Sequence, residues 1–126
     1  FRSPKTRQRM LDLNLQTSSR VQVIDPVGFF DFVNLEQNSY MALSDSGTVQ
    51  EEMCLFQIPT ITIRATTERP ETVWCGSNIV TGLEVDNIVA GYQAMKLSNK
   101  SWSIPAEYNQ TNVSATVVNI LLGNYV

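Results

Sequence analysis

Short apolar runs alternate along the chain with longer stretches that have the composition of helices. Four β-branched or aromatic runs are bounded by turn-forming residues and predict strands, at residues 21–24, 40–43, 60–64 and 77–80. Spaced apolar positions predict helices around them, at residues 6–13, 29–38, 46–56, 69–73, 86–97 and 114–122. Because strands alternate with helices across short links, we expect an α/β fold with a Rossmann-like parallel sheet and helices on both faces.

Ligands of such sheets bind at the carboxyl ends of the strands, and residues 44–47 follow a predicted strand at that end. A helix that begins there directs its free N–H groups and its positive dipole end beyond the sheet edge. Gly47 lets the backbone approach a ligand, and the hydroxyls of Ser46 and Thr48 suit phosphate oxygens. This turn therefore indicates an anion site.

An ordinary helix cap explains the same turn. Thr48 and Glu51 have the spacing of a capping box. On local sequence alone, capping is favoured over phosphate binding by about two to one. Glu52 lies one turn after Thr48 on the same helix face, where a carboxylate suits the paired hydroxyls of a ribose or stays solvated.

A second polar segment, residues 66–71, follows the predicted strand at 60–64 and falls at the same edge. In one interpretation Arg69 contacts an anionic or hydroxyl-rich ligand. In the other, the segment is a loop that leads to Pro70 in the first turn of a helix.

The aromatic group Phe29, Phe30 and Phe32 is a candidate shelf for a base, but burial in the core is favoured by about three to one. Cys54 and Cys75 are expected to be free thiols, with packing the more frequent role.

Composition and charge narrow the class of partner. The 126 residues, with 43% hydrophobic content and a net charge of −3, fit one globular domain and argue against nucleic acid or a membrane as the main partner. No apolar run approaches the roughly 20 residues of a membrane span, and no signal-peptide core is visible, so we expect a cytoplasmic protein. The start at Phe1 suggests an excised piece. With no histidine and only two cysteines, we expect no zinc site.

Two motifs resemble those of the non-hydrolysing UDP-N-acetylglucosamine 2-epimerases. DSGTVQEE at 45–52 is close to the family's Asp-Ser-Gly-Gly-(Ile/Val)-Gln-Glu-Glu. RATTERPETVWCGSN at 64–78 is close to the family's Arg-Asp-Thr-Thr-Glu-Arg-Pro-Glu followed by Gly-Thr/Ser-Asn. The block at 24–47 fits with matching spacing, so the resemblance covers almost the whole chain. It reverses the odds and favours phosphate binding at the turn.

The resemblance implies a two-domain fold of the glycosyltransferase-B type. Residues 1–126 would form part of its C-terminal UDP-binding domain, and residues 105–126 a linker and the C-terminal helix. The implied UDP contacts are the diphosphate at Ser46, Gly47 and Thr48, the ribose at Glu52 and the uracil at the Phe32 backbone, with Arg69 in a loop at the cleft.

The family inverts the sugar at C2 by proton abstraction, elimination of UDP to a glycal intermediate and re-addition of UDP, without metal or nicotinamide. Its proton-transfer residues lie mostly in the N-terminal domain. We therefore expect this chain to bind UDP weakly and to be inactive alone. We also expect its full-length parent to be a homodimer that acts on a UDP-N-acetylhexosamine.

Three positions depart from the family pattern. Ser3 replaces a frequent His linked in some members to a regulatory nucleotide-sugar site, and Ala65 and Thr48 replace a frequent Asp and Gly. The motifs SGTVQEE, CGSN and WSIPAEYNQTNVS look more like the capsule and O-antigen branch that makes UDP-N-acetyl-L-fucosamine. A glycosyltransferase of the same fold type and a non-catalytic nucleotide-sugar-binding module remain alternatives.

Overall fold

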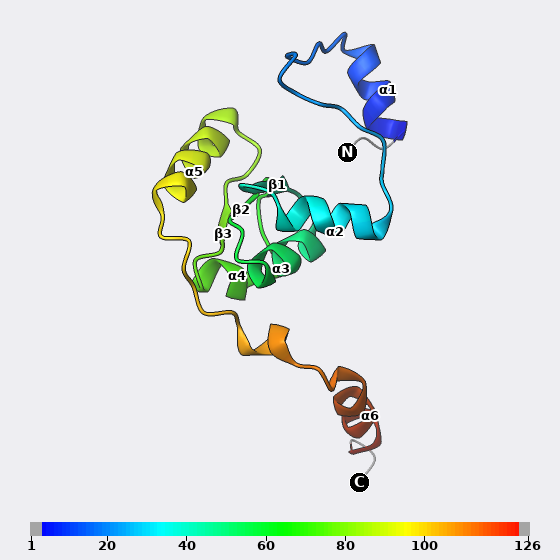
Figure 1. Ribbon diagram of the computed structural model, residues 1–126, viewed down its shortest axis with the longest axis vertical. Coiled ribbons are helices and arrows are strands. Elements are labelled where there is room, and N and C mark those ends of the chain that lie inside the picture. The colour runs from blue at the N-terminus through cyan, green and yellow to red at the C-terminus, as the bar shows by residue number, and fades with distance from the viewer. Residues whose placement is uncertain (1–3, 124–126) are drawn as a thin grey trace. The chain divides into compact units, whose positions relative to one another are not determined.

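The computed structural model describes residues 4–123 (Figure 1). The chain forms two compact units, Phe1–Leu35 and Glu36–Val126, which are described separately. Helix α1 (Pro4–Asp12) and most of α2 (Phe29–Gln37) belong to the first unit. Both helices agree with the sequence prediction. Ser3, where the sequence departs from the family's His, lies outside the described residues.

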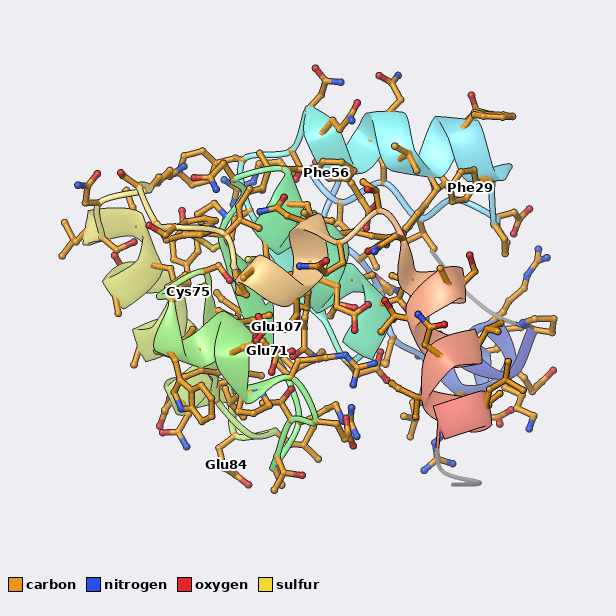
Figure 2. The ribbon with its side chains drawn as sticks, turned by 90° about the horizontal axis from the view of Figure 1, so that it is seen from below. Phe29, Phe56, Glu71, Cys75, Glu84 and Glu107 are labelled. Atoms are coloured by element: carbon orange, nitrogen blue, oxygen red, sulfur yellow. The ribbon has the colours of Figure 1, made fainter. Side chains whose placement is uncertain are left out.

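Two expectations for the first unit were wrong. Residues 21–24 form no strand, and Val21 and Ile24 are 54% and 39% exposed. A β-branched run becomes a strand only where a neighbouring strand and a packed face support it. Phe29 and Phe30 are not core residues, since they are 67% and 85% exposed and contact each other edge to face at 5.7 Å between ring centroids. Figure 2 shows Phe29 at one end of α2.

The second unit is built on a parallel sheet of three strands in the order β1-β2-β3. These are β1 (Ala42–Ser44), β2 (Thr60–Thr62) and β3 (Asn78–Val80). In the register, Thr60 lies opposite both Ala42 and Asn78. The expected parallel sheet is confirmed, although the run at 21–24 does not join it and β1 begins two residues later than the pattern suggested.

The helices of the second unit begin and end close to the predicted positions. They are α3 (Gly47–Leu55), α4 (Pro70–Trp74), α5 (Val85–Leu97) and, after a 3-10 turn η1 (Ala106–Asn109), α6 (Val113–Gly123). No helix within residues 4–123 is both long enough and apolar enough to cross a membrane.

Side chains alternate between the two faces of the sheet, as they must in a strand. On one face, a methyl group added to Gly91 of α5 would meet Ile79 at 3.5 Å and Ile61 at 3.9 Å. On the other face, the Thr62 hydroxyl donates a hydrogen bond to Asn78 Oδ1 at 2.8 Å, towards α3 and α4. Figure 1 shows α5 on one side of the sheet and α3 with α4 on the other, so both faces are covered.

Candidate functional site

The turn between β1 and α3 leaves the start of the helix without a side-chain cap. Ser46 occupies the N-cap position with extended backbone (φ −83°, ψ 132°), and its side chain makes no capping hydrogen bond. The backbone N–H of Ser46 itself donates to Ser44 Oγ at 3.1 Å. The first N–H groups of α3 therefore point beyond the carboxyl end of β1 with no hydroxyl of Ser46 bound to them.

The capping-box interpretation of Thr48 and Glu51 was wrong. Thr48 lies inside α3, which begins at Gly47, and so cannot be its N-cap residue. The Glu51 carboxylate accepts a hydrogen bond from Arg69 Nε in an ion pair instead of reaching back to the start of its own helix. The ordinary explanation of the turn therefore does not hold, and the anion-site interpretation gains weight.

Arg69 lies beside the start of α3, in the loop that follows β2. Its backbone N–H donates to Thr67 Oγ1 at 3.0 Å, and its Nη1 donates to the carbonyl of Glu68 at 3.1 Å. A methyl group added to Gly47 would lie 4.0 Å from Arg69 Nη2. The hydrogen bond and charge of Glu51 raise the pKa of Arg69. The positive charge of Arg69, fixed by these contacts, therefore adds to the positive end of the α3 helix dipole.

Gln50 joins the segments that carry this site. It is fully buried, and its Nε2 donates to the Ser46 carbonyl at 3.2 Å. Its Oε1 accepts hydrogen bonds from Thr67 Oγ1 at 2.6 Å and from Asn78 Nδ2 at 3.1 Å. Asn78 Nδ2 also donates to Thr72 Oγ1 at 3.1 Å. The sequence reasoning missed Gln50, although its place inside the DSGTVQEE motif was an available signal.

Glu36 and Glu52 form a second polar feature, which the sequence reasoning also missed. Glu36, in the last turn of α2, is only 6% exposed, and neither carboxyl oxygen has a hydrogen-bond partner at ordinary geometry among the described residues. Burial raises the pKa of Glu36 to about 7, and the Glu52 carboxylate adds to the shift. Burial also raises the pKa of Glu52 on α3. A carboxylate expected at a ribose therefore has a buried carboxyl neighbour.

The other candidate residues divide between the two units. Ser46 and Gly47 lie at the start of α3 beside Arg69, while Thr48 is exposed in its first turn. Phe32 belongs to the first unit, where its backbone N–H donates to the Gly28 carbonyl at 2.9 Å. A contact of Phe32 with a base stays a prediction.

The described residues hold two free thiols and no grouped set of metal ligands. Within residues 4–123, no three His, Cys, Asp or Glu side chains are grouped so that they could hold a metal ion. Cys54 and Cys75 are free thiols with their sulfurs 3.8 Å apart, which confirms that expectation. Figure 2 shows Cys75 at the end of α4, whose first turn carries Glu71.

Comparison with known proteins supplies the family. The family model described as UDP-N-acetylglucosamine 2-epimerase matches residues 1–122. The chain belongs to the UDP-N-acetylglucosamine 2-epimerase family.

Individual 2-epimerases resemble the chain in sequence and fold. A UDP-N-acetylglucosamine 2-epimerase of Methanococcus maripaludis is 35% identical over 124 residues, which are 95% of this chain and 33% of the relative. A UDP-2,3-diacetamido-2,3-dideoxy-D-glucuronate 2-epimerase of Pseudomonas aeruginosa is 44% identical over 86 residues, or 68% of this chain and 24% of the relative. The Methanocaldococcus jannaschii UDP-GlcNAc 2-epimerase, solved in complex with UDP-GlcNAc and UDP, superposes with a TM-score of 0.83 at 35% identity.

That superposition covers 95% of this chain and 34% of the solved 2-epimerase. The chain therefore spans about a third of the length of these relatives. The expected fold class is confirmed, since the parallel α/β sheet matches part of the glycosyltransferase-B-type fold of the solved 2-epimerases.

Proposed function

We propose that this chain is the UDP-binding part of the C-terminal domain of a UDP-N-acetylhexosamine 2-epimerase. The observation that carries the proposal is the start of α3, where the Ser46 side chain caps nothing and Arg69 lies beside Gly47. Free backbone N–H groups at a helix start, together with a guanidinium, suit a diphosphate. A solved relative described as a complex with UDP-GlcNAc and UDP supports this choice of ligand.

The diphosphate would lie against three residues of the turn. The hydroxyls of Ser46 and Thr48 donate hydrogen bonds to its oxygens, and Gly47 leaves room for the backbone N–H groups to approach. Arg69 borders the cleft and supplies a positive charge that Glu51 and Thr67 hold in place. Because these groups are fixed before the ligand arrives, little ordering is needed on binding.

The nucleoside would extend along α3 and beyond. The Glu52 carboxylate accepts hydrogen bonds from the two ribose hydroxyls, and the backbone of Phe32 contacts the uracil. Residues 105–126 serve as a linker and the C-terminal helix of the domain, of which residues 124–126 lie outside the described part of the chain.

In the whole enzyme, the sugar is inverted at C2 by proton abstraction, elimination of UDP and re-addition of UDP to the other face. The anion site holds the UDP that leaves, so that the pyrophosphate charge which develops during elimination is stabilised and UDP stays for re-addition. The groups that move the proton lie in the remaining two thirds of the enzyme, so this chain alone is inactive. The family match favours epimerisation over the glycosyltransferase alternative.

We assign the sugar nucleotide to the branch that produces UDP-N-acetyl-L-fucosamine for bacterial capsule or O-antigen, on the motifs SGTVQEE and CGSN. The parent enzyme is a cytoplasmic homodimer. The names of the Methanococcus and Pseudomonas relatives specify different sugars. The sugar of the parent enzyme must therefore be tested directly.

Calorimetric titration of UDP into this chain near neutral pH tests the proposal. The Ser46→Ala/Glu52→Ala double variant should lose binding, while Glu107→Gln, which removes an exposed charge, should bind as the wild type does. Equal UDP affinity of the double variant and the wild type would show that the nucleotide does not bind at the α3 turn.

A further inference from the structure

Glu36 is a buried acid with no evident structural task. It is only 6% exposed, and no N–H or hydroxyl group of residues 4–123 donates a hydrogen bond to either of its carboxyl oxygens. An unpartnered buried polar group is costly, and an ionised one far more so. A buried acid that is retained despite this cost is therefore a candidate for a functional role.

The group beside Glu36 is the carboxylate of Glu52. The two side chains come from different helices, α2 and α3, and their charges interact. Two neighbouring carboxyl groups cannot both ionise without a penalty, so the pair retains one proton over a wide pH range. In that state one oxygen is an O–H donor and the other carboxylate remains an acceptor.

The proton belongs on Glu36 when a ribose is bound. A carboxylate that receives two hydroxyl donors is stabilised in its ionised form, so a bound ribose keeps Glu52 ionised. Burial favours the neutral form of Glu36, whose pKa is raised to about 7. A neutral Glu36 can then satisfy its own O–H by donating to Glu52.

We propose that Glu36 is a positioning residue of the ribose subsite, which in its neutral form donates a hydrogen bond to Glu52 and aims that carboxylate at the ribose hydroxyls. This inference rests on the proposed function, since it takes Glu52 as the ribose ligand. It adds a residue on α2 to the site and ties nucleotide affinity to one proton.

Within the described part of the chain, no neighbouring positive charge compensates the two carboxylates when Glu36 loses its proton. Glu51, which neighbours Glu52 on α3, raises the pKa of Glu52, and its own charge is paired with Arg69. Arg64 is paired with the exposed Glu68. Among residues 4–123, no cation forms an ion pair with Glu36 or Glu52. Loss of the Glu36 proton therefore places two uncompensated carboxylates next to each other.

The pH dependence of UDP binding follows from this. As the pH rises through 7, Glu36 ionises and repels the Glu52 carboxylate that the ribose needs. A binding-linked rise of one unit in the pKa of Glu36 corresponds to about a tenfold loss of affinity between pH 6 and pH 8.5. Because the terminal phosphate of UDP also titrates, only the difference between variants isolates the contribution of Glu36.

The experiment is a calorimetric measurement of the UDP dissociation constant at pH 6, 7 and 8.5 for wild type and three variants. Glu36→Gln keeps a donor for Glu52 without a titrating proton, Glu36→Met removes the donor at similar length, and Glu84→Gln is the control. Glu84 is exposed, and its side chain projects outward in Figure 2. Circular dichroism checks that each variant folds.

We expect Glu36→Gln to match the wild type within about twofold at pH 6 and to bind about tenfold more tightly than the wild type at pH 8.5. Glu36→Met should bind weakly at every pH, and Glu84→Gln should follow the wild type. Identical pH profiles of the wild type and Glu36→Gln would overturn the inference while leaving the proposed function standing. Absence of UDP binding by the wild type at all three pH values would instead overturn the proposed function, and the ribose role with it.

A ligand-free measurement tests the carboxyl pair by itself. In the ¹³C NMR titration of the Glu36 side chain, the midpoint should lie near pH 7 and fall in Glu52→Gln. A midpoint near 4.5, unchanged by Glu52→Gln, would overturn the pair even if UDP binds.

Discussion

The guanidinium of Arg69 forms an ion pair with Glu51 of α3 and also lies beside Gly47, at the start of the same helix. The pair joins the loop after β2 to α3 across 18 positions of sequence. This salt bridge therefore orients the cation and pairs the charge of the Glu51 carboxylate. Glu51 holds Arg69 in place, and Gly47 leaves the space beside it open.

Replacing Arg69 by Ala should weaken UDP binding by about tenfold, because a charge-assisted hydrogen bond to phosphate contributes about 1.5 kcal/mol or more. Calorimetry at low ionic strength measures the change. Arg64→Ala is the matched control, since Arg64 donates to the exposed Glu68 at 2.7 and 2.9 Å and lies in no proposed contact. Equal losses in both variants would mean that general charge, not the position of Arg69, governs binding.

Replacing Gln50 by Leu should destabilise the fold by about 2 to 4 kcal/mol. The change leaves Thr67 Oγ1 and Asn78 Nδ2 without their shared acceptor inside the protein. Urea unfolding followed by circular dichroism gives the free energy. Gln110→Leu is the control, because Gln110 is exposed and makes only a 3.4 Å bond to the Ala106 carbonyl. A loss below 1 kcal/mol for Gln50→Leu would show that the network does not hold the site together.

The buried Glu36 should make the free energy of unfolding fall with rising pH. Its pKa is raised from 4.5 to about 7 in the folded state, so the folded protein holds the proton more tightly than the unfolded chain does. Stability is therefore lost between pH 4.5 and pH 7, by about 2 to 3 kcal/mol in total. Glu36→Gln lacks this loss, and its stability relative to wild type should rise by that amount between pH 4.5 and pH 8. Urea unfolding at the two pH values would refute the assignment if the difference stayed constant.

The two thiols should differ in reactivity. Cys54 is fully buried, and burial raises its pKa to about 11, whereas Cys75 is half-buried. Since the thiolate is the nucleophile, iodoacetamide at pH 8 should modify Cys75 first and leave Cys54 intact in the folded protein. Intact mass and peptide mapping distinguish the two sites. Equal labelling under native conditions would mean that the end of α3 opens readily.

The order of elements could be predicted from the sequence because each relevant signal is local. Gly47 marks the start of α3, Pro70 the first turn of α4, and the apolar run at 60–64 contains β2. The apolar run at 21–24 was wrongly predicted to be a strand, because strand formation depends on neighbouring strands that the sequence does not display. Phe29 and Phe30 misled in the same way, since burial depends on what packs against them.

The candidate site was predictable only in part. The turn at Ser46 and Gly47 carries its signal in the motif, and Arg69, which the resemblance assigned to a loop at the cleft, lies beside Gly47 in the structure. The capping box was an error because the pairing of Glu51 with a distant arginine is a tertiary contact. Glu36 could not be found, because a charged residue near the end of an amphipathic helix is normally exposed, and its burial depends on tertiary contacts that the sequence does not display.

The most direct test of the central claim is a ¹H–¹⁵N NMR titration of the chain with UDP, with pyrophosphate and uridine as separate probes. If the diphosphate lies at the start of α3, the Gly47 and Thr48 amide signals should shift saturably with UDP and with pyrophosphate, but not with uridine. Saturable shifts confined to other parts of the chain, with the Gly47 and Thr48 amides unmoved, would contradict the account.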